Sequence, residues 1–272
     1  LVLANSLTGI GTIDEAMDAL KADGLFEQII REPLTAARDL LIDYANASEA
    51  DKSEVVTGAE MLAKALDAAA PAKAIFDVAV AKRLGVTIDE AWDAEQFVAL
   101  AAMREVREVV DPLQPAHMPF LFPEVFLRDR PGFDVLVGNP PWEEVMVEEP
   151  KFWLRVRPGL LGLKPADLKA EITRLRSERA DLLPELQREI DLVDALRKVL
   201  LAGPYPGLGT GDVDLYSAFA WRFWHLLRDS GQFGIVVPRS QFNAAGGREW
   251  REHVLPSATT EIVTLLNNRQ WV

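Results

Sequence analysis

The chain carries the stretch Phe-Asp-Val-Leu-Val-Gly-Asn-Pro-Pro-Trp at residues 133–142, and this segment decides more about the fold than any other. Residues 133–137 are mostly apolar and include the β-branched Val135 and Val137, which predicts a β-strand buried on both faces, as in a parallel sheet. Gly138 ends the predicted strand, and Pro140 and Pro141 then fix φ and remove two backbone N–H donors. The stretch therefore predicts an α/β fold with a rigid turn directly after a buried strand.

The predicted turn is rich in hydrogen-bond acceptors. The side-chain oxygen of Asn139 and the carbonyls of Asn139 and Pro140 can hold both hydrogens of an –NH2 group and direct its lone pair toward an electrophile. Trp142 adds a flat face on which a planar ring can stack. A strand end with a Pro-Pro stop is the simpler interpretation, because Pro-Pro is common in turns. The complete string is more specific than the dipeptide, and it favours a site for exocyclic amino groups.

Composition places the chain among globular proteins and excludes several kinds of chemistry. With 272 residues and 49% hydrophobic content, the chain can bury a sizeable core in one or two domains. It has no cysteine, which excludes disulfides, thiolate metal sites and cysteine nucleophiles. The three histidines show no ligand spacing, so structural roles are expected and no metal site is predicted. Neither a membrane-length apolar run nor a signal peptide is visible, and we expect a soluble, cytoplasmic protein.

The negative charge is unevenly distributed along the chain. The formal net charge is −13, and residues 1–118 carry 21 acidic against 10 basic side chains, whereas residues 119–272 carry 21 against 19. DNA affinity depends on Lys and Arg side chains that neutralise phosphates. Most of any DNA-binding surface is therefore expected outside this segment.

Two long helical regions interrupt the strand-forming part of the sequence. Apolar residues recur at helical spacing among acidic residues from 12 to 110, and a 4-3 rhythm from 165 to 202 predicts a helical hairpin or short coiled coil with Pro184 near its turn. The prolines among the aromatic residues of 118–126 predict an extended loop. The glycine-rich stretch 203–211 lacks a phosphate-loop pattern and is expected to be a flexible connection.

The remaining segments alternate between strand and helix. The pattern predicts a helix over 216–228, a turn at 229–232, a strand over 233–238, a helix near 247–255 and a strand over 261–266. Further strands are expected at 1–4 and at the end of the chain. Alternation of this kind is typical of a mostly parallel α/β sheet.

Residues 214–242, Asp-Leu-Tyr through Pro-Arg-Ser-Gln-Phe, resemble the segment that follows the Asn-Pro-Pro-aromatic motif in γ-class adenine-N6 DNA methyltransferases. Residues 122–126, the helical insertions and residues 268–272 resemble more narrowly the large methylases of type IIG restriction–modification and of phage defence. The resemblance implies an α/β, partial Rossmann-like S-adenosylmethionine-dependent methyltransferase sheet with large helical insertions. Its core would comprise residues 1–10, 118–150 and 203–272, with an acidic helical insertion at 11–117 and a hairpin or coiled-coil insertion at 151–202.

The resemblance also implies roles for individual residues. Asn139 and the Pro140 carbonyl would accept the hydrogens of the target amino group, Pro141 would stiffen the turn, and Trp142 would stack on an adenine flipped out of the duplex. S-adenosylmethionine would donate the methyl group without a metal. Asn5 stands where the family often has an acidic residue that contacts the cofactor's adenine, although it can equally be a plain loop residue.

The chain also departs from the family pattern. The glycine-rich cofactor loop, the acidic residue that binds ribose, a target-recognition domain and a nuclease constellation are not found in this sequence. The chain starts without methionine and ends inside a predicted strand. We therefore expect a segment of a longer enzyme, whose other parts bind double-stranded DNA. Alone, the segment is expected to bind S-adenosylmethionine poorly and to methylate little.

Two other functions fit the same residues. Asn-Pro-Pro-aromatic turns also serve methyltransferases of RNA or protein amino groups, although the long insertions favour the DNA branch by family analogy. The chain can also be a non-catalytic interaction module of a larger complex, in which the acidic helices bind a partner subunit. The DNA recognition sequence, any nuclease in the parent and the oligomeric state are not set by this sequence.

Overall fold

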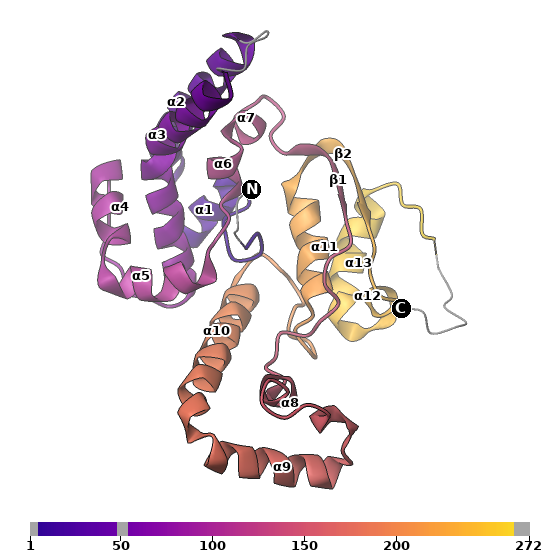
Figure 1. Cartoon of the computed structure of the whole chain (residues 1–272). Helices are drawn as coiled ribbons and strands as arrows, with labels where there is room; N and C mark the ends of the chain where they lie inside the picture. Colours follow the sequence, from indigo (N-terminus) through magenta and orange to yellow (C-terminus); the bar gives the residue numbers. More distant parts are fainter. Residues whose placement is uncertain (1–4, 48–53, 264–272) are drawn as a thin grey trace.

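The computed structural model describes residues 5–47 and 54–263, and this part of the chain is mostly helical with one two-stranded parallel sheet (Figure 1). The predicted α/β class is confirmed at this level. The elements follow the chain in this order: α1 (Ile13–Leu20), α2 (Gly24–Ala47), α3 (Glu54–Arg83), α4 (Ala94–Ala101), α5 (Arg104–Val110), η1 (Asp111–Leu113), α6 (Met118–Leu121), α7 (Pro123–Phe126), β1 (Phe133–Gly138), α8 (Glu149–Trp153), η2 (Leu160–Gly162), α9 (Pro165–Glu178), η3 (Ala180–Leu182), α10 (Leu183–Ala202), α11 (Leu215–Leu226), β2 (Leu227–Ile235), α12 (Ser240–Asn243), η4 (Ala245–Gly247) and α13 (Arg248–Ser257).

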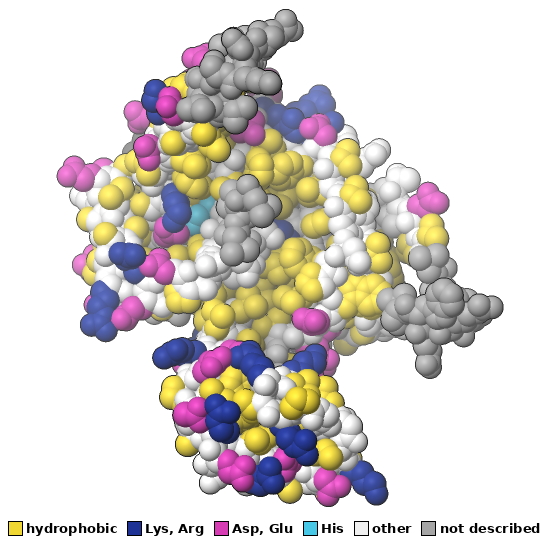
Figure 2. All heavy atoms as spheres, viewed as in Figure 1, with side chains coloured by type: hydrophobic (Ala, Val, Ile, Leu, Met, Phe, Trp, Pro, Cys, Tyr) yellow, Lys and Arg dark blue, Asp and Glu magenta, His cyan; other side chains and the backbone are white. Residues whose placement is uncertain are grey.

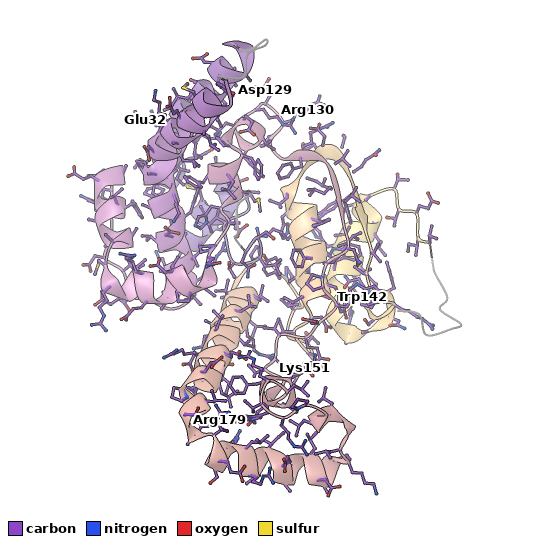
Figure 3. All side chains as sticks on the ribbon, viewed as in Figure 1. Glu32, Asp129, Arg130, Trp142, Lys151 and Arg179 are labelled. Atoms are coloured by element: carbon purple, nitrogen blue, oxygen red, sulfur yellow. The ribbon has the colours of Figure 1, made fainter. Side chains whose placement is uncertain are left out.

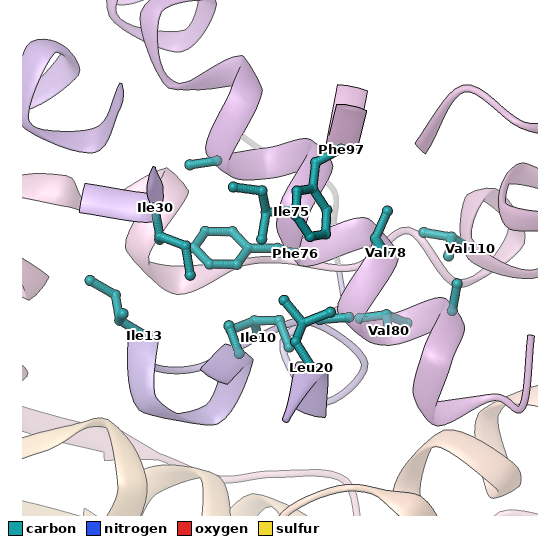
Figure 4. Close-up of a cluster of buried hydrophobic side chains, with 14 of the residues drawn as sticks. Ile10, Ile13, Leu20, Ile30, Ile75, Phe76, Val78, Val80, Phe97 and Val110 are labelled. Atoms are coloured by element: carbon teal, nitrogen blue, oxygen red, sulfur yellow. The ribbon is translucent and has the colours of Figure 1, made fainter. Parts of the chain in front are cut away.

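Helices α1 to α5 form the first packed region, as the helical periodicity of residues 12–110 predicts. Their apolar faces meet in one buried cluster in which Ile30, Phe76 and Phe97 lie close together (Figure 4). The long helices α2 and α3 pack side by side, and the small residues Ala69 and Ala72 of α3 are fully buried within this cluster. This region carries no residue of the predicted amino-group site.

The predicted hairpin at 165–202 is also helical. Helix α9 and helix α10 are joined by the short η3 turn, and Pro184 stands in the first turn of α10, where a missing N–H costs nothing. Trp153 of α8 is fully buried in the apolar cluster that these helices share. Charged atoms of both signs alternate over this lower lobe of the molecule (Figure 2). The division of the chain into a core and two insertions stays a prediction.

The sheet is less buried than the sequence predicts. β1 and β2 pair in parallel, with Val137 opposite Gly234 and Gly138 opposite Ile235. Helix α11 covers the face that carries Gly138, since a Cβ on this glycine would lie 2.8 Å from the Phe223 ring. The other face is open, and the Val137 side chain is 80% exposed. The prediction of a strand buried on both faces is therefore wrong, because in the described part of the chain helices cover only one face of the sheet.

Three other predictions of secondary structure need correction. Residues 118–126 are not an extended loop, because Pro119 and Pro123 stand in the first turns of the short helices α6 and α7, where proline is tolerated. Residues 229–232 lie within β2, where the pairing register is irregular opposite Phe133 and Val135 and Ser230 has a φ of 64°. The strand predicted over 261–266 does not start at 261–263, and its remainder lies outside the described residues, as do the strands predicted at 1–4 and at the chain end.

A buried ion cluster joins the first helical region to the sheet region. Arg222 of α11 is 1% exposed and its Nη1 donates to Glu15 Oε2 at 2.6 Å, while Arg83 Nη1 of α3 donates to Glu15 Oε1 at 2.7 Å. Arg222 also donates to the carbonyl of Gly9 at 2.9 Å. Burial alone would raise the pKa of the Glu15 carboxyl, but Arg222 and Arg83 hold it at about 2. Glu15 is therefore ionised at neutral pH and binds both regions together.

His117 forms a second buried link in the same area. Its Nδ1 accepts from the Ile10 N–H at 3.0 Å, and its Nε2 lies 2.9 Å from Asp77 Oδ1. A ring nitrogen that accepts a backbone N–H must be unprotonated, so His117 is neutral with its proton on Nε2. Burial lowers the pKa of His117, and the Asp77 carboxylate opposes this shift only in part. The structural role expected for this histidine is confirmed.

Replacing Arg222 should destabilise the fold strongly. We expect Arg222→Met to lower the free energy of unfolding by about 3–5 kcal/mol, because Glu15 then keeps a buried charge that Arg83 alone must balance. Urea unfolding measures the loss. Arg248→Met is the matched control, since Arg248 pairs with Glu252 at the surface and its loss should leave unfolding unchanged. Equal stability of the two variants would contradict this account.

Acidification should weaken the fold through the buried histidines. The folded pKa values of His117 and His225 are lowered, that of His225 to about 4. As the pH falls, the unfolded chain therefore takes up protons on these histidines before the folded chain does. The free energy of unfolding decreases below about pH 6.5, by up to about 1.4 kcal/mol per pH unit for each histidine. His117→Gln, which keeps a donor and an acceptor, should reduce this slope in chemical unfolding measured between about pH 7 and 5. An unchanged slope would contradict it.

Candidate functional site

The parallel strands place two turns at one edge of the sheet. β1 and β2 both end at this edge, and the Val236 N–H just after β2 donates to the Gly138 carbonyl at 3.0 Å. The chain after β1 enters the Asn-Pro-Pro-Trp turn, and the chain after β2 enters Pro238 and α12. Carboxyl ends of parallel strands are a common location for ligand sites in α/β folds. The candidate site is therefore built at this edge.

The turn after β1 presents free acceptors. The Asn139 side chain is exposed, and within the described residues it makes no hydrogen bond. The carbonyl oxygens of Asn139 and Pro140 accept no backbone hydrogen bond among the described turns and loops. The Pro140 ring is buried and Pro141 is exposed, so the turn is anchored through one proline. Such an arrangement can accept two hydrogens from one amino group.

Trp142 closes the turn against the neighbouring strand. Its indole Nε1 lies 3.4 Å from the Val236 carbonyl, and the side chain remains 45% exposed. Figure 3 shows Trp142 at the end of the sheet region where α12 begins. The contact with Val236 leaves much of the ring open to solvent. An indole held at one edge and exposed elsewhere can stack on a planar ring.

The exit from the turn is held by the segment that precedes α11. The Leu215 N–H donates to the Glu143 carbonyl at 3.1 Å, and the Val145 N–H donates to the Val213 carbonyl at 2.8 Å. Glu144 and Asp214 form the antiparallel bridge between these two bonds. The turn is thus fixed at its entry by β1, at Trp142 by β2 and at its exit by the start of α11.

A polar cluster beside this exit was assigned no site role from the sequence. The Tyr216 hydroxyl donates to Asp214 Oδ2 at 2.7 Å and lies 2.8 Å from Ser240 Oγ. Burial raises the pKa of Tyr216, so its hydroxyl stays protonated at neutral pH. The Asp-Leu-Tyr run at the start of the predicted helix was the available signal. Its partner Ser240 lies 24 residues further along the chain, and sequence spacing does not show that contact.

Asn5 lies apart from the turn, beside a pocket of about 390 Å³. Its Oδ1 accepts from the Leu7 N–H at 3.0 Å, and its backbone pairs with Gln114 and Ala116. Apolar side chains that include Phe219 of α11 and Leu196 of α10 line the pocket. Phe219 and Phe223 stand four residues apart on one face of α11, and Phe223 lies against Gly138. Helix α11 therefore connects the pocket to the end of β1. No described hydrogen bond joins Asn5 to Asn139.

Comparisons of the chain with protein-family models, with curated proteins and with solved structures gave no match. Among the residues that the structure describes, no group of three or more His, Asp or Glu side chains is placed to hold a metal ion. No helix in the described ranges is long and apolar enough to cross a membrane. The function must therefore be argued from the residues at the sheet edge and at the pocket.

Asn139 should be dispensable for folding. We expect Asn139→Ala to change the free energy of unfolding by less than about 0.5 kcal/mol, because the side chain is exposed and has no described partner. In contrast, Gly138→Ala should cost about 1 kcal/mol or more, because its Cβ would overlap the Phe223 ring. Thermal and urea unfolding compare the two. A large loss of stability in Asn139→Ala would show that this residue is structural.

Proposed function

We propose that the chain forms part of an S-adenosylmethionine-dependent DNA adenine-N6 methyltransferase of the restriction–modification or phage-defence kind. One observation carries the proposal: the exposed Asn139 amide and the unpaired carbonyls beside it stand next to a half-exposed indole at the carboxyl edge of a parallel sheet. An adenine amino group needs two acceptors for its hydrogens and a flat surface for its ring. The turn offers both within a rigid frame.

The proposed chemistry requires no base at the start. The Asn139 oxygen and the Pro140 carbonyl accept the two amino hydrogens, which turns the nitrogen lone pair away from the ring. As the nitrogen bonds to the methyl group, positive charge develops on the amino group, and the two acceptors stabilise it electrostatically. After transfer, the amino group would lose one proton to solvent water. When bound, S-adenosylmethionine would supply the electrophilic methyl group on a sulfonium, whose sulfur would keep the electrons of the broken bond.

The pocket beside Asn5 suits the adenosine part of this donor. Its volume of about 390 Å³ and its walls of Leu113, Leu196 and Phe219 provide an apolar slot, and the polar residues Asn5 and Gln114 also line it. The Asn5 oxygen accepts from the Leu7 N–H, and its amide nitrogen has no described hydrogen bond, so that the nitrogen can donate to a ligand. We therefore propose Asn5 as a cofactor contact.

We propose that double-stranded DNA binds mainly through parts of a parent protein outside residues 1–272. The formal net charge of −13 disfavours phosphate contacts. The arginines of the α8–α10 lobe are largely engaged by carboxylates, as Arg155 is by Glu185 and Arg176 by Glu149. These ion pairs occupy part of the positive charge of the lobe, whereas Lys164, Lys169, Arg188, Arg197 and Lys198 have no described ion pair.

A non-catalytic interaction module is the second candidate. The open face of the sheet exposes Val135 and Val137. Hydrophobic atoms also gather in the middle of the face seen in Figure 2, between the first helical region and the sheet region. Exposed apolar surface of this kind can mark a protein interface. A methyltransferase of RNA or protein amino groups would use the same turn and differs only in its substrate.

A labelled methyl group identifies the reaction. The longest natural chain that contains residues 1–272 is incubated with methyl-labelled S-adenosylmethionine and mixed-sequence DNA, and the DNA is digested to nucleosides. We expect the label on N6-methyladenine, and we expect Asn139→Ala to lower kcat by a factor of at least about 100, because an acceptor for the developing charge is lost.

The stability measured for Asn139→Ala is the control for this loss. A variant that folds like the wild type and transfers no methyl places Asn139 in the reaction. Label found on RNA or on protein instead of DNA would redirect the proposal to another substrate. Absence of transfer to every substrate, with partner binding intact in Asn139→Ala, would favour the interaction module.

A further inference from the structure

We infer that Tyr216 is a positioning residue of the transfer site: its hydroxyl fixes the segment after β2 to the point where the turn after β1 ends. The inference rests on the proposed function, because the turn that Tyr216 helps to hold is the one that carries the amino-group acceptors. Tyr216 would touch neither the target base nor the donor. It would act through Asp214 and Ser240.

The hydroxyl joins two segments that the sheet alone does not connect. It donates to Asp214 Oδ2 at 2.7 Å, and Ser240 Oγ then donates to it at 2.8 Å. Asp214 immediately precedes α11, and Ser240 begins α12. The Asp214 carboxylate makes no capping bond to the N-terminus of α11, although it occupies the capping position. Its described hydrogen bond is the one to Tyr216.

The same point holds the exit of the acceptor turn. Asp214 is bridged to Glu144, with the Leu215–Glu143 and Val145–Val213 hydrogen bonds on either side. A shift of Asp214 therefore moves the backbone that follows Trp142. On the other side of the turn, Trp142 bonds the Val236 carbonyl, four residues before Ser240. Tyr216 thus closes a ring of contacts that runs through both turns.

The hydroxyl is not needed to attach α12 to α11. The Ser217 hydroxyl already donates to the Gln241 side-chain oxygen at 2.8 Å, and both residues are buried. The Tyr216 ring is also buried and keeps its packing when the hydroxyl is removed. Tyr216→Phe should therefore fold, while the turn gains freedom at its exit. A misplacement of about 1 Å can cost a factor of about 100 in rate.

The test compares two tyrosines that each lose one hydroxyl. In the longest natural chain that contains residues 1–272, we expect Tyr216→Phe to lower kcat for methyl transfer by a factor of about ten or more, with the KM for the donor changed less than about twofold. Tyr205 is also buried, and its hydroxyl donates to the Leu7 carbonyl at 2.8 Å and not to Asp214 or Ser240. Tyr205→Phe should leave kcat within about twofold.

Asp214 provides a rescue experiment. Asp214→Asn keeps an oxygen that can accept from the Tyr216 hydroxyl, whereas Asp214→Ala does not. We expect kcat near the wild-type value in the first variant and a loss like that of Tyr216→Phe in the second. Equal kcat in Tyr216→Phe and Tyr205→Phe would overturn the inference.

A second readout does not depend on activity. With 5-fluorotryptophan incorporated, the ¹⁹F signal of Trp142 is assigned by its absence in Trp142→Phe. We expect this signal to shift in Tyr216→Phe and to stay in place in Tyr205→Phe. If the wild type transfers no methyl group, the proposed function fails, and the position of this signal still decides whether Tyr216 holds the turn. An unmoved Trp142 signal overturns the inference in either case.

Discussion

The buried contact between Arg222 and Glu15 is the interaction on which the rest of the structure depends. It joins α11, which backs the sheet, to α1 in the first helical region, across 207 positions of sequence. Two charges removed from water are tolerated only when each has close partners. Arg83 and the Gly9 carbonyl complete the set. The cluster therefore fixes how the two regions meet, and with it the place of the pocket beside Asn5.

Helix α11 links all parts of the candidate site. Its start holds the exit of the acceptor turn through Leu215, and its next turns place Phe219 at the pocket and Phe223 against Gly138. Arg222 lies on the same helix and faces the ion cluster. One rigid element thus sets the spacing between the proposed donor pocket and the proposed amino-group acceptors. Rigid support of this kind favours transfer between two bound groups, because it holds them in a reactive arrangement.

The sheet provides the edge at which the two turns meet, although helices cover only one of its faces in the described chain. Parallel strands are normally covered on both sides. The exposed Val135 and Val137 depart from that rule and form the apolar surface that an interaction module would use. In the transferase proposal, the same open face leaves room for further parts of a longer protein. The methyl-transfer experiment distinguishes the transferase from the interaction module, whatever covers the open face of the sheet.

The sequence by itself determined the local elements. Helical spacing predicts α1 to α5 and the hairpin of α9 and α10, and the run at 133–138 predicts β1 and its turn, because these patterns depend on neighbours a few residues apart. The sequence mispredicts the exposure of β1, the helices at 118–126 and the extent of β2, because packing rather than local preference decides them. The Tyr216–Ser240 contact and the pocket that joins Asn5 to Phe219 arise from the tertiary structure. Their residues lie far apart in the chain, and no spacing rule reports a contact that only packing creates.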